Sequence, residues 1–316
     1  MRSFVKNAYY GGLGILFADR WKAAQLHRSG SITVLNLHRV SPHPNAFWPP
    51  LHPTIFEDLL IFLKKNFEVR RFDELDLPDN GKPIAVLSFD DGYYDFIEYA
   101  LPLLTKYGFR ANLNLIPKCA ETGIPIWNVR LYDFLEAAPR ELIEQIRLPN
   151  FETKLVGEDP RSRLSFGIAI SRYLKQRSRA DREELWQPLE ALITKLDHRS
   201  TRMMSTSDLA AIADETELGV HSFSHESMAF ESQEFFEDDF RLCREYFAGK
   251  LNLPMNVYAF PNGSYRDEQI QFLRGNGIDR ILLVDEKIAD RNSDVVPRIT
   301  MYGESAAEIR MRALGF

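Results

Sequence analysis

The sequence predicts an α/β protein, built as a distorted, nearly closed parallel (β/α)7 barrel with an α-helical insertion after the third strand. Short apolar runs rich in β-branched residues alternate with longer helical patterns, which is typical of βα units and a parallel sheet. A length of 316 residues suits one such barrel, since the fold runs to ~250 residues or more with insertions. An open doubly wound sheet is the alternative, but no GxGxxG follows the first strand.

The strands and the helices between them follow from these patterns. Seven runs are predicted as strands: Ile32–Leu37, Ile84–Phe89, Ala111–Ile116, Glu217–Val220, Asn256–Phe260, Arg280–Val284 and Val295–Ile299. Apolar residues spaced three and four apart begin a helix near Phe56, and Thr54 with Glu57 reads as a capping box. Further helices are predicted over 97–107, 209–213, 235–251 and 267–274, and Gly108 and Gly275 are expected to end the first and last of these.

Residues 119–204 interrupt this alternation and make up the predicted insertion within one domain of residues 1–316. They contain helical patterns at 127–138, 140–146, 162–176 and 181–196, and no convincing strand. Loops after barrel strands lie on the active-site face, so the insertion is expected to cover the pocket and to help select the substrate. A purely structural role is the alternative.

Composition narrows the classes of function. The net charge of −6 argues against nucleic acid as a partner, and 45% apolar residues are ample for a large core. Cys119 and Cys243 have no metal-site spacing and are expected to be reduced, buried thiols, in keeping with a cytoplasmic protein. Neither a serine-hydrolase G-x-S-x-G nor a P-loop is present.

The N-terminal segment allows two interpretations. Residues 7–18 are uncharged, a run too short for a membrane span, and no cleavage site of a signal peptide is evident. The segment is expected either to pack on the barrel or to act as an interfacial anchor over residues 5–22. In the second case Lys6, Arg20 and Lys22 would face lipid phosphates, and the cytoplasmic protein would associate peripherally with a membrane.

Polar residues stand at the carboxyl ends of most predicted strands. His38 follows the first, Asp90 and Asp91 the second and His221 the fourth, with His225 four residues on. The fifth is followed by a loop containing Asn262, the sixth by Asp285, and the seventh ends at Arg298. In a parallel barrel these positions converge on one mouth, where catalytic residues lie.

Two histidines and a carboxylate form a frequent open metal site, and zinc is its commonest occupant. His221 and His225 point the same way if the turn that joins them is helical. Without a metal, the two histidines would be hydrogen-bonded loop residues, and Asp90-Asp91-Gly92 would be a solvated turn. That alternative explains the glycine, but not the fully apolar run that leads into the two carboxylates.

Three motifs resemble those of the polysaccharide deacetylases, the metal-dependent carbohydrate esterases of family four. Ser88-Phe89-Asp90-Asp91-Gly92 is similar to their Thr/Ser-Phe-Asp-Asp-Gly motif, and His221-Ser222-Phe223-Ser224-His225 to their His-Ser/Thr-x-x-His motif. Phe260-Pro261-Asn262-Gly263 looks like a variant of the third, Arg-x-Pro-Tyr followed by Gly. The resemblance covers about residues 32–117 and 205–299, and the insertion lies outside it.

The resemblance implies a set of roles. Asp91, His221 and His225 would bind a divalent metal ion, most often zinc in such sites. Asp90 would be the general base that takes a proton from the attacking water. The backbone N–H of Asn262 would stabilise the oxyanion in the place of the family's tyrosine.

Two departures from the family pattern lead to further hypotheses. Ala259 stands where the third motif has an arginine that orients the base, and Arg298 is expected to supply that charge to Asp90. The family's late Leu-x-His motif is missing, since no histidine follows His225. One branch of the family instead has an N-terminal Tyr-His-x-Val-like motif, which residues 37–40 resemble, so His38 is expected to be the general acid.

The resemblance therefore implies a metal-dependent hydrolase that removes an N-acetyl group from a carbohydrate. Deformylation of a lipid-linked amino sugar, hydrolysis of a non-sugar amide and a non-catalytic glycan-binding barrel are the alternatives. Trp48, Tyr93, Tyr94 and Trp127 are candidates for stacking on sugar rings, although each is more often a packing aromatic.

Overall fold

The fold is taken from a computed structural model, which describes residues 18–316. The uncharged run and Lys6, on which the expected membrane anchor depends, lie almost wholly outside the described residues. None of the helices in the described part is both long enough and apolar enough to cross a membrane.

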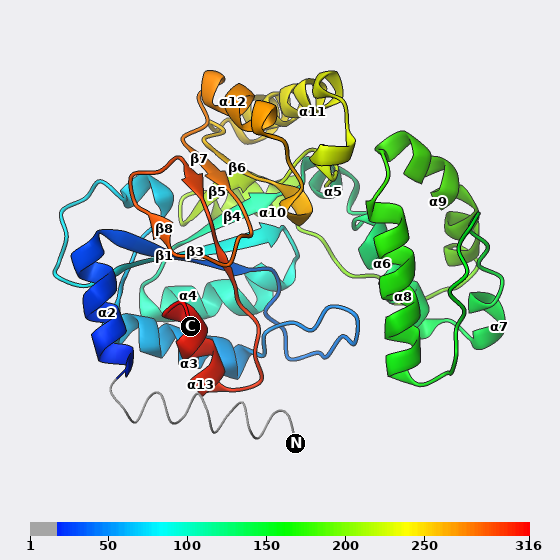
Figure 1. The fold of residues 1–316 in the computed structure, drawn as a ribbon, viewed down its shortest axis with the longest axis horizontal. Helices are drawn as coiled ribbons and strands as arrows, with labels where there is room; N and C mark the ends of the chain where they lie inside the picture. The colour runs from blue at the N-terminus through cyan, green and yellow to red at the C-terminus, as the bar shows by residue number, and fades with distance from the viewer. Residues whose placement is uncertain (1–17) are drawn as a thin grey trace.

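A parallel sheet forms the centre of the molecule and is nearly closed into a barrel (Figure 1). Its strands are β1 Ser31–Leu37, β2 Glu68–Val69, β3 Ile84–Asp91, β4 Ala111–Leu115, β5 Thr216–Val220, β6 Val257–Ala259, β7 Arg280–Leu282, β8 Ala289–Asp290, β9 Val295–Val296 and β10 Ile299–Thr300. They are ordered β10-β1-β3-β4-β5-β6-β7-β9, with β2 beside β3 and β8 antiparallel to β1. The predicted barrel is confirmed, and the two-residue strands β2 and β8 are additions that the sequence patterns did not indicate.

The predicted seventh strand is wrong as a single element, because the chain breaks between β9 and β10. β9 pairs with β7 and β10 pairs with β1, so these two pieces connect the two ends of the sheet. Pro297 lies in the break. Proline has a fixed φ and no backbone N–H, so it cannot donate to the hydrogen-bond ladder of a strand. The break frees Arg298 from the ladder and turns its side chain into the barrel.

The inner face of the barrel has an apolar bottom and a polar top. Ile32 and Val34 of β1 are in register with Ile84 and Val86 of β3, and all four belong to one buried cluster with residues of β6, β7 and β9. Successive side chains of a strand alternate between faces, so the next inward pair is Asn36 and Ser88, and Asp90 follows on β3. The change from apolar to polar marks the end of the barrel at which the predicted site residues lie.

Helices cover the outside of the sheet, and most match the sequence patterns. The barrel helices are α2 Ala18–Ser29, α3 Pro53–Asn66, α4 Leu101–Tyr107, α10 Thr206–Ile212, α11 Gln233–Tyr246, α12 Asp267–Gly275 and α13 Ala306–Ala313. Short 3-10 or π turns occur at η1 Phe72–Glu74, η2 Phe96–Ala100, η3 Met228–Phe230, η4 Phe247–Leu251 and η5 Pro261–Gly263. Gly108 ends α4 in the left-handed region with φ 70°, as predicted.

The predicted capping box of α3 is not formed. The imidazole of His52 accepts a hydrogen bond from the backbone N–H of Thr54, and Pro53 occupies the first turn. Proline suits that position because its missing N–H would have no partner there in any case. The helix therefore begins two residues earlier than it would with Thr54 as its N-cap.

The segment between β4 and β5 consists of helices joined by loops. It contains α5 Pro117–Thr122, α6 Trp127–Ala137, α7 Arg140–Ile143, α8 Pro160–Lys175 and α9 Arg179–Ile193, and residues 116–215 form no strand. Figure 1 shows α6, α7, α8 and α9 grouped to one side of the barrel. They have a hydrophobic core of their own, in which Leu131, Leu135, Ile170 and Leu174 are buried.

Candidate active site

A buried hydrogen-bond network lies beneath Asp90. The carboxamide of Asn114 donates to Asp90 Oδ1 (2.8 Å) and to Ser88 Oγ (3.2 Å), and Ser88 in turn donates to Asn112 Oδ1 (2.8 Å). All four side chains are at most 1% exposed. Such a network holds the carboxylate in one orientation, because each polar group buried with it would lose a partner if it moved.

Arg298 holds the other edge of Asp90. Its guanidinium donates to both carboxylate oxygens, over 2.7 Å to Oδ1 and 2.8 Å to Oδ2, and its Nε donates to the carbonyl of Leu283 (3.0 Å). Burial alone would raise the pKa of Asp90, but the charge and hydrogen bonds of Arg298 outweigh it and hold this pKa well below its ordinary value. The contact that the Arg298 hypothesis requires is thus present, while its part in a reaction stays a prediction.

Asp91 reaches the same side as Asp90 because the chain turns there. Strict alternation would place the two on opposite faces, but Asp91 has φ 75°, in the left-handed region. Its Oδ1 lies 3.6 Å from His221 Nε2 and 3.5 Å from His225 Nε2. The three ligand atoms lie within 4.8 Å of one another, and all three residues are buried.

The loop that carries the histidines is not a helical turn, so the two side chains converge by another route than the helical one considered from their spacing. Ser222 and His225 have φ 62° and 64°, and two such residues cannot lie in a right-handed turn. Asp239 of α11 fixes the loop by accepting hydrogen bonds from the backbone N–H of Phe223 and from the hydroxyl of Ser222. Left-handed backbone at non-glycine residues is strained and persists where the surroundings impose it, as they do here.

The hydrogen bond made by Nδ1 of His221 shows which of its two ring nitrogens carries the proton. Nδ1 lies 2.8 Å from the carbonyl oxygen of Ala259, which can only accept, so Nδ1 carries the proton and Nε2 offers a lone pair toward Asp91. Burial lowers the pKa of both His221 and His225, and the charge of Lys175 lowers that of His225 further. Both rings are therefore neutral near pH 7, which is the form that binds a metal.

The three residues fit a divalent ion. Two ligands that each lie about 2.0–2.2 Å from one tetrahedral ion stand roughly 3.3 Å apart, close to the distances found here. Asp91 Oδ1 is buried and has no hydrogen-bond partner among the described residues, as expected of an atom that is directed at a cation. The donor set leaves further positions for water or substrate.

A cavity of about 220 Å³ joins these residues to others. It is lined by Asp90, Asp91, His221 and His225, by His38 and Trp48 from the loop after β1, and also by Asn36, Tyr93, Ile126, Asn128, Val129, Tyr132, Lys175, Phe260, Asn262, Val284 and Thr300. The His38 ring packs edge-on against Trp48, with their centroids 5.2 Å apart.

The cavity takes in most of the predicted site residues, although not all of them. Asp285 is exposed and is not among its lining residues. Tyr94 and Trp127 line other cavities, so of the four candidate sugar-stacking aromatics only Trp48 and Tyr93 border this one.

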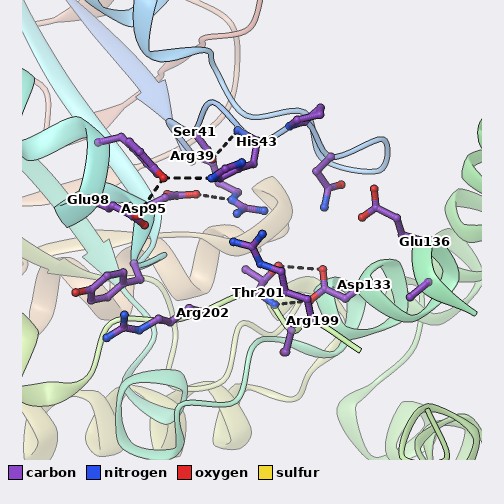
Figure 2. Close-up of a pocket in the computed structure, with 16 residues that line it drawn as sticks. Arg39, Ser41, His43, Asp95, Glu98, Asp133, Glu136, Arg199, Thr201 and Arg202 are labelled. Atoms are coloured by element: carbon purple, nitrogen blue, oxygen red, sulfur yellow. Dashed lines mark hydrogen bonds and ion pairs between the residues drawn. The ribbon is translucent and has the colours of Figure 1, made fainter. Parts of the chain in front are cut away.

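A larger cavity of about 630 Å³ lies apart from the metal-ligand candidates (Figure 2). It is bordered by Arg39, which is ion-paired with Asp95 (2.7 Å), and by Thr201, whose hydroxyl donates to Asp133 (2.9 Å). None of its described lining residues belongs to the Asp91, His221 and His225 set. The larger of the two cavities is therefore not the one that holds the metal-ligand candidates.

Comparison with known proteins agrees with the motifs. Residues 192–281, which include His221, His225 and Asn262, match the polysaccharide deacetylase family model. The resemblance to the polysaccharide deacetylases is thereby confirmed. Asp90, Asp91 and Arg298 lie outside the matched residues, and the barrel brings them beside His221 and His225. No curated protein matches the chain.

Solved structures extend the polysaccharide deacetylase likeness to the fold of nearly the whole chain. The deacetylase PplD of Streptococcus pyogenes has a TM-score of 0.58 at 16% identity over 90% of this chain and 98% of its own. IcaB of Ammonifex degensii has a TM-score of 0.57 at 14% identity over 90% and 97%. A polysaccharide deacetylase from Bacillus cereus has a TM-score of 0.58 at 12% identity over 90% and 69%.

Sequence reasoning missed several residues that shape this polysaccharide deacetylase-like site. Asn112 and Asn114 were treated only as parts of a strand, and Ser88 only as the first residue of a motif. Polar residues at every second position of buried runs nevertheless signal a polar inner face. Asp239 and Lys175 had no such signal, because each reaches the site from a helix distant in sequence.

Proposed function

We propose that this protein is a metal-dependent hydrolase that removes an N-acetyl group from an N-acetylated carbohydrate. The observation that carries the proposal is the arrangement in one cavity of an arginine-held carboxylate, Asp90, beside the set Asp91, His221 and His225. The family match and the fold support a carbohydrate deacetylase, and PplD, one of the similar structures, is described in complex with acetate.

Each residue has a distinct task in this proposal. Asp91, His221 and His225 would hold the ion, which when bound would lower the pKa of a water molecule and polarise the acyl oxygen. Asp90 takes the proton of the attacking water, and Arg298 keeps Asp90 unprotonated and fixes its direction. The water oxygen forms a bond to the acyl carbon, the carbon–nitrogen bond breaks, and the departing amine takes a proton from His38.

The polar groups of the cavity rim complete the arrangement. Asn262 has φ 57°, and its carboxamide is held between Lys175 Nζ and Ser227 Oγ. This fixes the loop whose backbone N–H we assign to the oxyanion of the tetrahedral intermediate.

The test is release of acetate from a panel of N-acetylated sugars and oligosaccharides by the native protein. We expect activity that disappears when a chelator removes the metal and returns with added zinc, together with a lower Tm for the metal-free protein. Formate release from N-formylated sugars in place of acetate would favour the deformylase alternative. Glycan binding without hydrolysis in the zinc-loaded protein would contradict the proposal.

His38→Ala should lower kcat by about 10²–10⁴-fold if the imidazole protonates the leaving amine. Burial lowers the pKa of His38, while the charges of Asp91 and Asp90 oppose this change. A general acid must carry its proton, so the variant should also lose the fall in kcat that titration of His38 produces as the pH rises. An unchanged pH profile would place the acid elsewhere, and His43→Ala, in the neighbouring cavity, serves as the control.

A further inference from the structure

The helical insertion brings a lysine into the catalytic cavity. Lys175 is the last residue of α8, and it lines the cavity together with Asp91, His221 and His225. Among the described lining residues it is the only lysine, and no arginine is present. Its charge bears on both Asp91 and His225, which shows that it lies close to the metal-ligand candidates.

Lys175 forms no direct ion pair in the described part of the chain, and Asp91 is the carboxylate whose charge acts on it. Its Nζ donates to the Oδ1 atom of Asn262 over 2.7 Å, and that neutral amide is the hydrogen-bond partner found for it. An ammonium group has three N–H donors, so two stay available. The side chain of Lys175 is half-buried, and this burial lowers its pKa, so removing part of the charge from water has a cost.

The other charges of the cavity do not offset Lys175. Asp90 is already neutralised by the guanidinium of Arg298, which grips both of its oxygens. Asp91 supplies one negative charge, but a divalent ion held beside it brings two positive ones. With the ion in place the cavity has an excess of positive charge, and therefore favours a ligand that carries negative charge.

Asn36 gives a second, independent sign of a polar ligand. Its side chain is 1% exposed and lines the same cavity, yet neither its Nδ2 nor its Oδ1 has a partner among the described residues. Buried amides almost always have partners, so a ligand with hydroxyl or carbonyl groups would satisfy this one.

We propose that Lys175 is a specificity-determining residue that binds an anionic group of the substrate, a phosphate or a carboxylate carried next to the N-acetylated sugar. This rests on the proposed deacetylase function and narrows its substrate to anionic glycans or sugar phosphates. The insertion, through Lys175, thereby selects the substrate as well as covering the site.

Matched pairs of compounds test this proposal. One pair is N-acetylglucosamine and its 1-phosphate, and the other is N-acetylglucosamine linked to glucose or to glucuronic acid. The zinc-loaded wild type should prefer the anionic member of at least one pair, and the identity of that pair distinguishes a phosphate from a carboxylate. Lys175→Met should lower kcat/KM for the preferred anion by about tenfold to a hundredfold, mainly through KM, because a hydrogen bond to a charged group is lost.

Two further variants separate charge recognition from structure. Lys175→Arg keeps the charge and should recover much of the activity on the anionic compound. Lys195→Met removes an exposed charge at the end of the insertion and should leave all four substrates unaffected. The neutral compounds should lose less kcat/KM in Lys175→Met than the preferred anion does, because they lose only the support that Lys175 gives to Asn262 and no contact of their own.

Three other results would contradict the role of Lys175 or the deacetylase function itself. An equal loss on neutral and anionic compounds would mean that Lys175 only holds Asn262 or stabilises the oxyanion, and the inference would fail while the deacetylase function stood. A wild type with no preference for either anion would also refute it. No acetate from any compound, in protein that binds zinc, would remove the proposed function and the inference together.

Discussion

Asp90→Asn should reduce kcat by about 10²–10⁴-fold while the protein still binds zinc. The amide is nearly the same size as the carboxylate, but it cannot accept the proton of the attacking water. Asp91 and the two histidines are unchanged, so zinc affinity measured by calorimetric titration should stay close to that of the wild type. KM should change little, because the lost interaction operates in the transition state.

Asp91→Asn is the matched control for this prediction. It removes the same charge from the neighbouring residue, but from a metal-ligand candidate whose Oδ1 lies 3.5–3.6 Å from both histidines. We expect this variant to lose zinc affinity as well as activity. If Asp90→Asn kept full activity, or if it lost zinc as severely as Asp91→Asn, the division of tasks between the two carboxylates would be wrong.

Arg298→Met should cause the largest loss of stability, about 3–5 kcal/mol in the free energy of unfolding. The guanidinium is fully buried and donates to both oxygens of Asp90. Its removal leaves a buried carboxylate without its partner, and methionine fills the volume without replacing the charge. Urea denaturation would measure the change, and Arg241→Met, which breaks exposed ion pairs on α11, should hardly alter the transition.

The same substitution should move the acid side of the pH–activity profile. Arg298 holds the pKa of Asp90 below its ordinary value, so in the wild type the base is unprotonated and the ion pair is intact throughout the neutral range. The stabilisation from this pair is lost only when the pH falls below the ordinary pKa of an aspartate, near 4.

Without Arg298, burial raises the pKa of Asp90, and a protonated base cannot accept a proton. The acid limb of kcat/KM should therefore shift to higher pH in Arg298→Met. Arg298→Lys keeps a charge but cannot form both hydrogen bonds, so its acid limb should lie between those of the wild type and Arg298→Met. An unshifted acid limb in a folded Arg298→Met protein would exclude Arg298 as the residue that sets the protonation of Asp90.

Several parts of the site could be predicted because they follow from short, local patterns. Apolar runs that end in Asp90 and His221 indicated parallel strands with functional residues at their carboxyl ends, and the barrel topology brings such ends together. The helical segment between the third and fourth predicted strands was recognisable from its lack of β-branched runs. Periodicity and strand order are properties that a sequence records directly.

Other features escaped prediction because they arise from contacts between distant segments. Val295, Val296 and Ile299 favour a strand, so residues 295–299 were predicted as one element although Pro297 indicates a break. The left-handed conformations of Ser222 and His225 depend on Asp239, which lies on another helix. The i, i+4 spacing of His221 and His225 was compatible with a helical turn, but packing against α11 produced a loop with left-handed residues instead.

The sequence by itself determined the parallel barrel, the helical insertion and the residues Asp90, Asp91, His221 and His225, because strand periodicity and motif order depend only on neighbours in the chain. The tertiary structure decided how the two carboxylates differ. Asp90 is held by Arg298, 208 residues away in the chain, whereas Asp91 turns toward the histidines with an unpartnered oxygen. It also decided that Lys175 of the insertion enters the cavity. The charge and burial around a side chain depend on which distant segments the fold brings beside it. The different surroundings of Asp90 and Asp91, and the place of Lys175, could therefore be read only from the folded barrel and its insertion.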